Sequence, residues 1–110
     1  MRRVGHYFSA HPLGRKITQL QGDSREFDFR AFYGKADLIF IDANHDYAYV
    51  KSDSAEALKM LSERGTVIWH DYPNSLGVSE CLSELKCDLA LHHIWETTLA
   101  CYSRASKAGA

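Results

Sequence analysis

The sequence has 110 residues, of which 45% are hydrophobic and 25% charged, a composition that fits one globular domain and excludes a disordered chain. Lys and Arg total 13 and Asp and Glu total 14, which gives a net charge of −1. This balance excludes a strongly basic nucleic-acid-binding surface, so we expect no nucleic-acid partner. The longest apolar run, 38–41, is far shorter than the ~20 residues of a membrane span, and we expect no membrane partner.

The cysteine content favours a reducing compartment. Cys81, Cys87 and Cys101 form an odd set without a C-x-x-C pair, so free thiols are expected rather than a disulfide framework. The basic start at 1–3 is not followed by the apolar segment of a secretory signal. We therefore expect a cytoplasmic protein.

The first third of the chain predicts three short elements. A helix over 4–8 should stop near Pro12, because the residue before a proline avoids the helical region. Residues 17–21 predict a short strand that ends at Gly22. The nearly continuous apolar run at 36–41 is typical of a strand covered on both faces in a parallel sheet.

The next segment changes from a strand period to a helix period. Residues 49–62 predict a helix whose apolar stripe comprises Val50, Ala57, Leu58 and Leu61. We expect this helix to end at Gly65, since a glycine adopts the positive φ common at helix ends. Residues 66–69 then predict a second buried strand.

The last part of the chain predicts a helix and a hairpin. The helix covers 78–85, and two strands at 89–95 and 98–103 are separated by 96–97. Alternating strands and helices followed by a hairpin predict an α/β fold, with a mostly parallel sheet and an antiparallel C-terminal end. We expect a flexible tail at 105–110.

Polar residues follow each of the three predicted parallel strands. These groups are 22–24 (GDS), 42–46 (DANHD) and 70–71 (HD). Ligands of open α/β sheets bind beyond the carboxyl ends of the strands. A ligand or catalytic site is therefore predicted at this end of the sheet.

The second and third groups suggest a metal site. Asp42 and Asp71 end adjacent strands if the helix between them is a right-handed crossover, so their carboxylates could share Mg²⁺. His70 or Asn44 could add a ligand, and His45 could act as a base. The structural alternative is that the aspartates cap the next helix or turn and that His70 packs against the other face of the sheet.

Two other chemistries are less well supported. The GDS at 22–24, with Asp42 and His45, is similar to a serine hydrolase motif, but a triad needs its histidine on a later loop that returns to the nucleophile. The run at 44–46 is similar to a fragment of a metallophosphatase, but the companion ligand motifs are missing.

Several motifs occur together in a specific order. They are ITQL at 17–20 with GDS, ADLIFIDANHDYAYVKSDSAEAL at 36–58, GTVIWHDY at 65–72, GV at 77–78 and EL at 84–85. This series, over about 4–104, resembles the C-terminal half of class I S-adenosylmethionine-dependent methyltransferases. The subgroup it most resembles is that of small-molecule O-methyltransferases.

The resemblance implies a fold and a methyl donor. The fold would be part of a doubly wound, Rossmann-like sheet whose full strand order is 3-2-1-4-5-7-6. The cofactor would be S-adenosylmethionine, with Asp23 at the adenine amino group, Ser24 beside it and Asp42 at the methyl-transfer site.

The resemblance also implies a catalytic role for the second and third groups. Asp42, His70 and Asp71 match positions that help to bind Mg²⁺ in metal-dependent relatives. The substrate would be a small molecule with a hydroxyl group, deprotonated by His45 or by metal at Asp42 and Asp71.

The first strand of that family and its glycine-rich turn have no counterpart in this sequence. We therefore expect a shortened single domain over 1–104, lacking the glycine-rich half of the cofactor site and binding S-adenosylmethionine weakly by itself. The alternative function is a non-catalytic binding or assembly module that keeps the half-fold. Strand 36–41 would lie at an edge of the sheet, so we expect a homodimer that pairs there unless 17–21 covers it.

Overall fold

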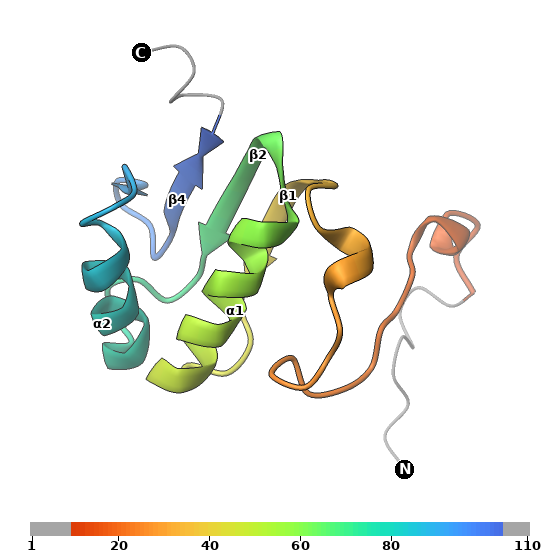
Figure 1. Ribbon diagram of the computed structural model, residues 1–110, viewed down its shortest axis with the longest axis horizontal. Coiled ribbons are helices and arrows are strands. Elements are labelled where there is room, and N and C mark those ends of the chain that lie inside the picture. The colour runs from red at the N-terminus through yellow and green to blue at the C-terminus, as the bar shows by residue number, and fades with distance from the viewer. Residues whose placement is uncertain (1–9, 105–110) are drawn as a thin grey trace.

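The computed structural model describes residues 10–104, so the helix expected at 4–8 and the tail at 105–110 lie outside the described residues. The fold is α/β, as predicted from the alternating elements (Figure 1). Two short 3-10 helices come first, at Gly14–Lys16 and Arg30–Phe32. The remaining elements are β1 (Ala36–Ile41), α1 (Tyr47–Met60), β2 (Leu61–Trp69), α2 (Leu76–Leu85), β3 (His92–His93) and β4 (Ala100–Ser103).

The sheet has four strands in the order β1-β2-β4-β3. β1 lies parallel to β2, with Ile39 opposite Val67 and Ile41 opposite Trp69, whereas β4 is antiparallel to both β2 and β3. This agrees with the expected parallel pair and antiparallel end. It also equals the 4-5-7-6 part of the strand order that the family resemblance implies.

The junction between α1 and β2 differs from the prediction. The helix ends at Met60, and Leu61 is already extended, with φ −66° and ψ 131°. Gly65 therefore does not end the helix but lies within β2. A Cβ on Gly65 would come within 2.4 Å of the Leu61 side chain and 2.8 Å of the carbonyl oxygen of Ala36. Glycine is needed there for close packing rather than for a helix end.

The strand predicted at 17–21 does not form. Ile17 and Leu20 are 49% and 48% exposed, and the two residues between them are polar. The segment therefore buries too little apolar surface to offset the entropy of ordering it against the sheet. Among the described residues its backbone makes no hydrogen bond to β1, which stays at the edge of the sheet.

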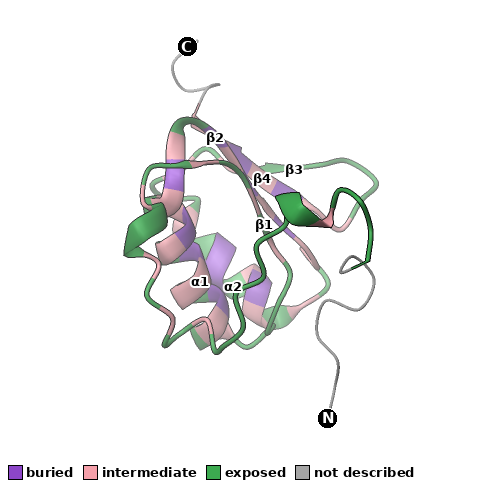
Figure 2. Cartoon of the chain, turned by 90° about the vertical axis from the view of Figure 1, so that its right-hand side faces the viewer, coloured by how far each residue is buried: buried purple, intermediate pink, exposed green. Residues whose placement is uncertain are grey.

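Both helices lie on the same face of the sheet, as Figures 1 and 2 show. The residues of β2 and β4 that face them are buried, and Ile39 and Ile41 of β1 are half-buried. Leu38 and Phe40 of β1 point the other way and are 66% and 55% exposed. The prediction that β1 is covered on both faces is therefore wrong for the described residues. A second layer of helices, as in a complete doubly wound fold, is not present in the part of the chain described.

The core lies between the helices and the covered face of the sheet. Trp69 is fully buried, and its indole Nε1–H donates to Ser54 Oγ of α1 at 2.9 Å. This hydrogen bond ties the middle of α1 to the carboxyl end of β2. The other buried apolar residues are Val50, Ala57, Leu61, Val67, Val78, Cys81, Leu82, Ala100 and Tyr102.

Two further sequence predictions bear on the described residues. Cys81, Cys87 and Cys101 are all free, as expected. In residues 10–104, neither helix is long and apolar enough to cross a membrane.

Replacing Ser54 with Ala should destabilise the fold, because the buried indole N–H of Trp69 would lose its acceptor. We expect the free energy of unfolding to fall by about 1–3 kcal/mol, measured by urea denaturation. The control is Ser83→Ala on the exposed side of α2, which should change stability by less than about 0.5 kcal/mol. Equal stability of the two variants would mean that this hydrogen bond does not hold α1 against β2.

Candidate functional site

The parallel pairing of β1 and β2 brings their polar ends together. Asp42 follows β1 directly, and His70 and Asp71 follow β2. The His70 amide donates to the carbonyl of Ile41 at 3.0 Å, so the two backbone segments remain side by side beyond the ends of β1 and β2. Asp42 and Asp71 therefore lie at the same edge of the sheet, as the sequence predicted.

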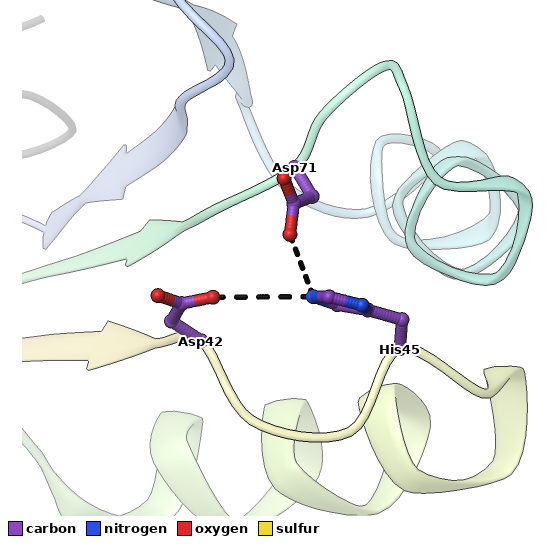
Figure 3. A group of neighbouring side chains, drawn as sticks. All are labelled: Asp42, His45 and Asp71. Atoms are coloured by element: carbon purple, nitrogen blue, oxygen red, sulfur yellow. Dashed lines mark ion pairs between the residues drawn. The ribbon is translucent and has the colours of Figure 1, made fainter.

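His45 reaches this edge from the loop between β1 and α1. Its Nε2 lies 2.6 Å from Asp71 Oδ2 and 3.9 Å from Asp42 Oδ1 (Figure 3). The loop turns back because Asn44 Oδ1 accepts the amide of Asp46 at 2.8 Å, a side-chain-to-backbone turn common for asparagine. Since the side-chain oxygen of Asn44 holds this turn, His45 supplies the side chain that reaches the aspartates.

The position of the His45 loop depends on close packing with α2. A Cβ on Gly77, in the first turn of α2, would lie 2.1 Å from the carbonyl oxygen of His45 and 2.8 Å from the amide nitrogen of Tyr47. Both contacts are to backbone, which cannot move aside as a flexible side chain can. The sequence showed Gly77 only as part of a motif, and its positioning role is evident only in the fold.

His70 contacts both aspartates through one ring nitrogen. Its Nδ1 lies 3.1 Å from Asp71 Oδ2 and 3.3 Å from Asp42 Oδ1, yet this buried atom has no hydrogen bond of acceptable geometry. Its other ring nitrogen lies 3.4 Å from Thr98 Oγ1, in the turn between β3 and β4. The ring also lies beside Phe40, with centroids 6.1 Å apart. His70 therefore packs against the open face and also directs Nδ1 at the carboxylates.

These side chains form a donor set suited to a divalent cation. One ligand atom each from Asp42, His45 and Asp71 lies within 4.8 Å of the others, and His70 Nδ1 adds a second imidazole nitrogen. Carboxylate oxygens suit Mg²⁺ and Mn²⁺, and imidazole suits transition metals. The Nδ1 of His70 is buried, makes no hydrogen bond and faces two carboxylates, so it is suited to act as a ligand of a cation.

The capping alternative is not supported. The residues that precede α1 and α2 are Asp46 and Ser75, and neither helix start has a side-chain cap. No helix N–H donates to the carboxylate of Asp42 or Asp71 in residues 10–104. Asp71 also has φ 63°, a left-handed backbone conformation that non-glycine residues adopt infrequently and that is enriched at functional sites.

Asp23 lies in a separate polar contact. Its Oδ1 accepts the amide of Arg25 at 2.9 Å, and its Oδ2 accepts the hydroxyl of Tyr49 at 2.8 Å. These two hydrogen bonds, together with the charge of Arg25, lower the pKa of Asp23 below its ordinary value of 3.8. The sequence analysis did not identify Tyr49 as a contact of Asp23, because the pattern there indicates only the first residue of a helix.

A cavity of about 160 Å³ is lined by residues from both the polar group at 22–24 and the polar group at 42–46. It lies between β1, α1 and the segment that contains Ser24 and Phe29, and Asp42 lines it as well. Pockets that enclose a whole drug-sized ligand are larger, roughly 300–1,000 Å³. The described residues therefore form a cavity that fits part of a ligand of that size, with Ser24 and Asp42 on its wall.

Comparison with known proteins identifies the family. Residues 1–72 match the model of a methyltransferase domain, a stretch that covers more than half of the chain and includes Asp23, Asp42, His45, His70 and Asp71. The chain belongs to this methyltransferase-domain family, whose general activity is methyl transfer. The chain matches none of the curated proteins and none of the solved structures with which it was compared.

Replacing Tyr49 with Phe should raise the pKa of Asp23 toward 3.8, because the hydroxyl that stabilises its carboxylate form is removed. The measurement is an NMR titration of the Asp23 side chain. Because the pKa of Asp23 is lowered in the folded state, its ionised carboxylate stabilises the fold at neutral pH. This stabilisation is lost as the pH falls through the pKa of Asp23 in the folded protein.

The control for this titration is Tyr33→Phe. The hydroxyl of Tyr33 donates to Glu56 at 2.6 Å and does not contact Asp23. This variant should leave the pKa of Asp23 unchanged. An unchanged value in Tyr49→Phe as well would show that the hydroxyl does not stabilise the carboxylate.

Proposed function

We propose that this domain transfers a methyl group from S-adenosylmethionine to a hydroxyl group of a small molecule, with the help of a divalent cation. One observation carries the proposal. Four side chains suited to metal binding and proton transfer (Asp42, His45, His70 and Asp71) converge at the carboxyl ends of β1 and β2 in a methyltransferase domain.

In this proposal Asp42, His70 and Asp71 hold the cation. The buried Nδ1 of His70, which faces both carboxylates without a hydrogen bond, supports its role as the nitrogen ligand. The contact between His70 Nε2 and Thr98 Oγ1 orients the ring. In metal-binding histidines the nitrogen that does not bind the metal commonly makes such a contact. When bound, Mg²⁺ would supply positive charge that favours the ionised form of a hydroxyl group.

His45 is proposed as the proton acceptor. It is half exposed, so its ring remains open to a molecule that arrives from solvent. A neutral imidazole that carries its proton on Nε2, the nitrogen 2.6 Å from Asp71 Oδ2, keeps a free lone pair on Nδ1. That nitrogen can take a proton from a substrate hydroxyl, while Asp71 stabilises the positive charge that forms on the ring.

Asp23, Ser24 and Asp42 are proposed to contact the methyl donor. Ser24 and Asp42 line the same cavity, and the lowered pKa of Asp23 keeps its carboxylate ionised and able to accept a hydrogen bond from an amino group. S-adenosylmethionine, when bound, supplies the methyl group on a positively charged sulfur. The carboxylate of Asp42, which lines this cavity, would favour that positive charge.

Mg²⁺ or Mn²⁺ should raise the melting temperature of the protein. At a concentration 100 times Kd the stabilisation is about 2.7 kcal/mol, which corresponds to roughly 10 °C for a domain of this size. Replacing both Asp42 and Asp71 with Asn should abolish the shift, because no carboxylate remains at the site. Differential scanning calorimetry with and without metal measures this.

The control for the metal measurement is Asp88→Asn, which removes an exposed carboxylate after α2. It should keep the full shift of the unmodified protein. A melting temperature that metal does not change in the unmodified protein, or a shift that persists in the double variant, would contradict the cation site.

Binding of S-adenosylhomocysteine, followed by isothermal titration calorimetry, tests the donor site. We expect Kd to be weaker than about 1 μM, because the cavity fits only part of such a ligand, and Asp23→Asn to weaken it about tenfold further. Asp28→Asn is the matched control, since it makes the same substitution at an exposed aspartate whose carboxylate is already paired with Arg30. No detectable binding at 1 mM ligand, on the order of −4 kcal/mol, would contradict the methyl-transfer proposal.

A further inference from the structure

His70 offers the candidate site a different kind of ligand atom from those of the two aspartates. Asp42 and Asp71 present carboxylate oxygens, whereas His70 presents Nδ1, 3.3 Å from Asp42 Oδ1 and 3.1 Å from Asp71 Oδ2. Asn44, predicted from the sequence as another ligand, uses its Oδ1 to accept the amide of Asp46. The neutral atom that faces both carboxylates is therefore a nitrogen rather than a third oxygen.

The His70 distances match those between neighbouring ligands of one metal ion. For metal–ligand bonds of about 2.1 Å, two ligands at a right angle lie about 3.0 Å apart and two at a tetrahedral angle about 3.4 Å apart. Both separations of His70 Nδ1 from the carboxylate oxygens fall between these values. His45 Nε2 is less evenly placed, at 2.6 Å from Asp71 Oδ2 and 3.9 Å from Asp42 Oδ1. His70 therefore has the position of a shared ligand.

Neither neutral form of the His70 ring satisfies Nδ1 by itself. With the proton on Nε2, Thr98 Oγ1 lies 3.4 Å away to accept it, and the lone pair of Nδ1 faces two negative oxygens. With the proton on Nδ1, that atom has no acceptor in hydrogen-bond geometry among the described residues. The side chain is 36% exposed, but Nδ1 itself is buried. A cation between Nδ1 and the two carboxylates would satisfy all three groups.

Nitrogen and oxygen ligands select different cations. Mg²⁺ is bound through carboxylate oxygens and water, whereas imidazole nitrogen suits first-row transition metals such as Fe²⁺ and Zn²⁺. We propose that His70 makes this site select a first-row transition-metal ion over Mg²⁺. This inference rests on the cation site of the proposed function and names the class of cation that the site takes.

A cation of this class is compatible with the roles proposed for the other residues. Three protein ligands leave such an ion at least one open position, because it takes about four to six ligands. A catalytic metal uses an open position to bind a substrate oxygen. His45, half exposed and close to Asp71, remains available as the proton acceptor.

Isothermal titration calorimetry with Co²⁺ and with Mg²⁺ tests the selectivity. We expect Co²⁺ to bind about 100-fold more tightly than Mg²⁺. His70→Asn, which replaces the imidazole with an amide, should weaken Co²⁺ binding about tenfold or more and Mg²⁺ binding less than about threefold. A purely structural loss would weaken both by the same factor, so the ratio of the two affinities isolates the nitrogen ligand. The matched control is His92→Asn, at an exposed histidine of β3, which should change neither affinity.

Bound Mn²⁺ reports the ligand itself, because a coordinated imidazole nitrogen modulates the electron spin echo of the ion. We expect this nitrogen modulation in the unmodified protein, its loss in His70→Asn and its retention in His45→Asn. Modulation that is absent from the unmodified protein, or that His45→Asn removes and His70→Asn keeps, would overturn the assignment of His70.

Failure of this inference is distinguishable from failure of the proposed function. Affinities for Co²⁺ and Mg²⁺ that differ by less than about tenfold, or a ratio that His70→Asn leaves unchanged, would overturn the selectivity and leave the cation site in place. Binding of neither ion would overturn the cation site itself. Binding that persists when both Asp42 and Asp71 are replaced with Asn would place the ion elsewhere and overturn both.

Discussion

The parallel pairing of β1 with β2 is the constraint on which the rest of the structure depends. It places Ile41 opposite Trp69, so the residues that follow both strands emerge at one edge of the sheet. Asp42 and Asp71 come together for this reason, although many residues and the whole of α1 separate them in the sequence. Two carboxylates held close by backbone pairing cannot move apart at little cost, and their repulsion favours a bound cation between them.

Packing on the covered face keeps this pairing and the site in register. The buried indole of Trp69 bonds to Ser54 of α1, which fixes the crossover helix over the end of β2. On the other side of the site, the absence of a side chain at Gly77 lets α2 lie directly on the backbone of His45. Thr98, in the turn before β4, contacts the outer nitrogen of His70. The side chains of the candidate site are therefore positioned by β1, β2, α2 and the hairpin together.

The sequence predicted the parallel pair and the site better than the edges of the fold. The apolar run of β1, the helix period after it and the strand-end aspartates are local signals, and each gave an element or residue close to its observed place. The prediction of a strand at 17–21 was wrong because the residue pattern of this segment does not indicate whether a partner strand lies beside it. Gly65 was wrongly predicted to end the helix for a related reason. Its close contact with Ala36 is a tertiary contact, which the spacing of residue types along the sequence does not indicate. Thr98 and Tyr49 likewise became evident only through contacts distant in sequence.

Paramagnetic broadening by Mn²⁺ in a ¹H–¹⁵N correlation spectrum tests the central claim most directly. The claim is that two strand ends, remote in sequence, create one cation site. The account predicts that substoichiometric Mn²⁺ broadens the amide signals of 42–45 and 70–71 together, with the same concentration dependence, and leaves the signals of α2 beyond its first turn sharp. Broadening of only one of the two segments, or of neither, would contradict a shared site between Asp42 and Asp71.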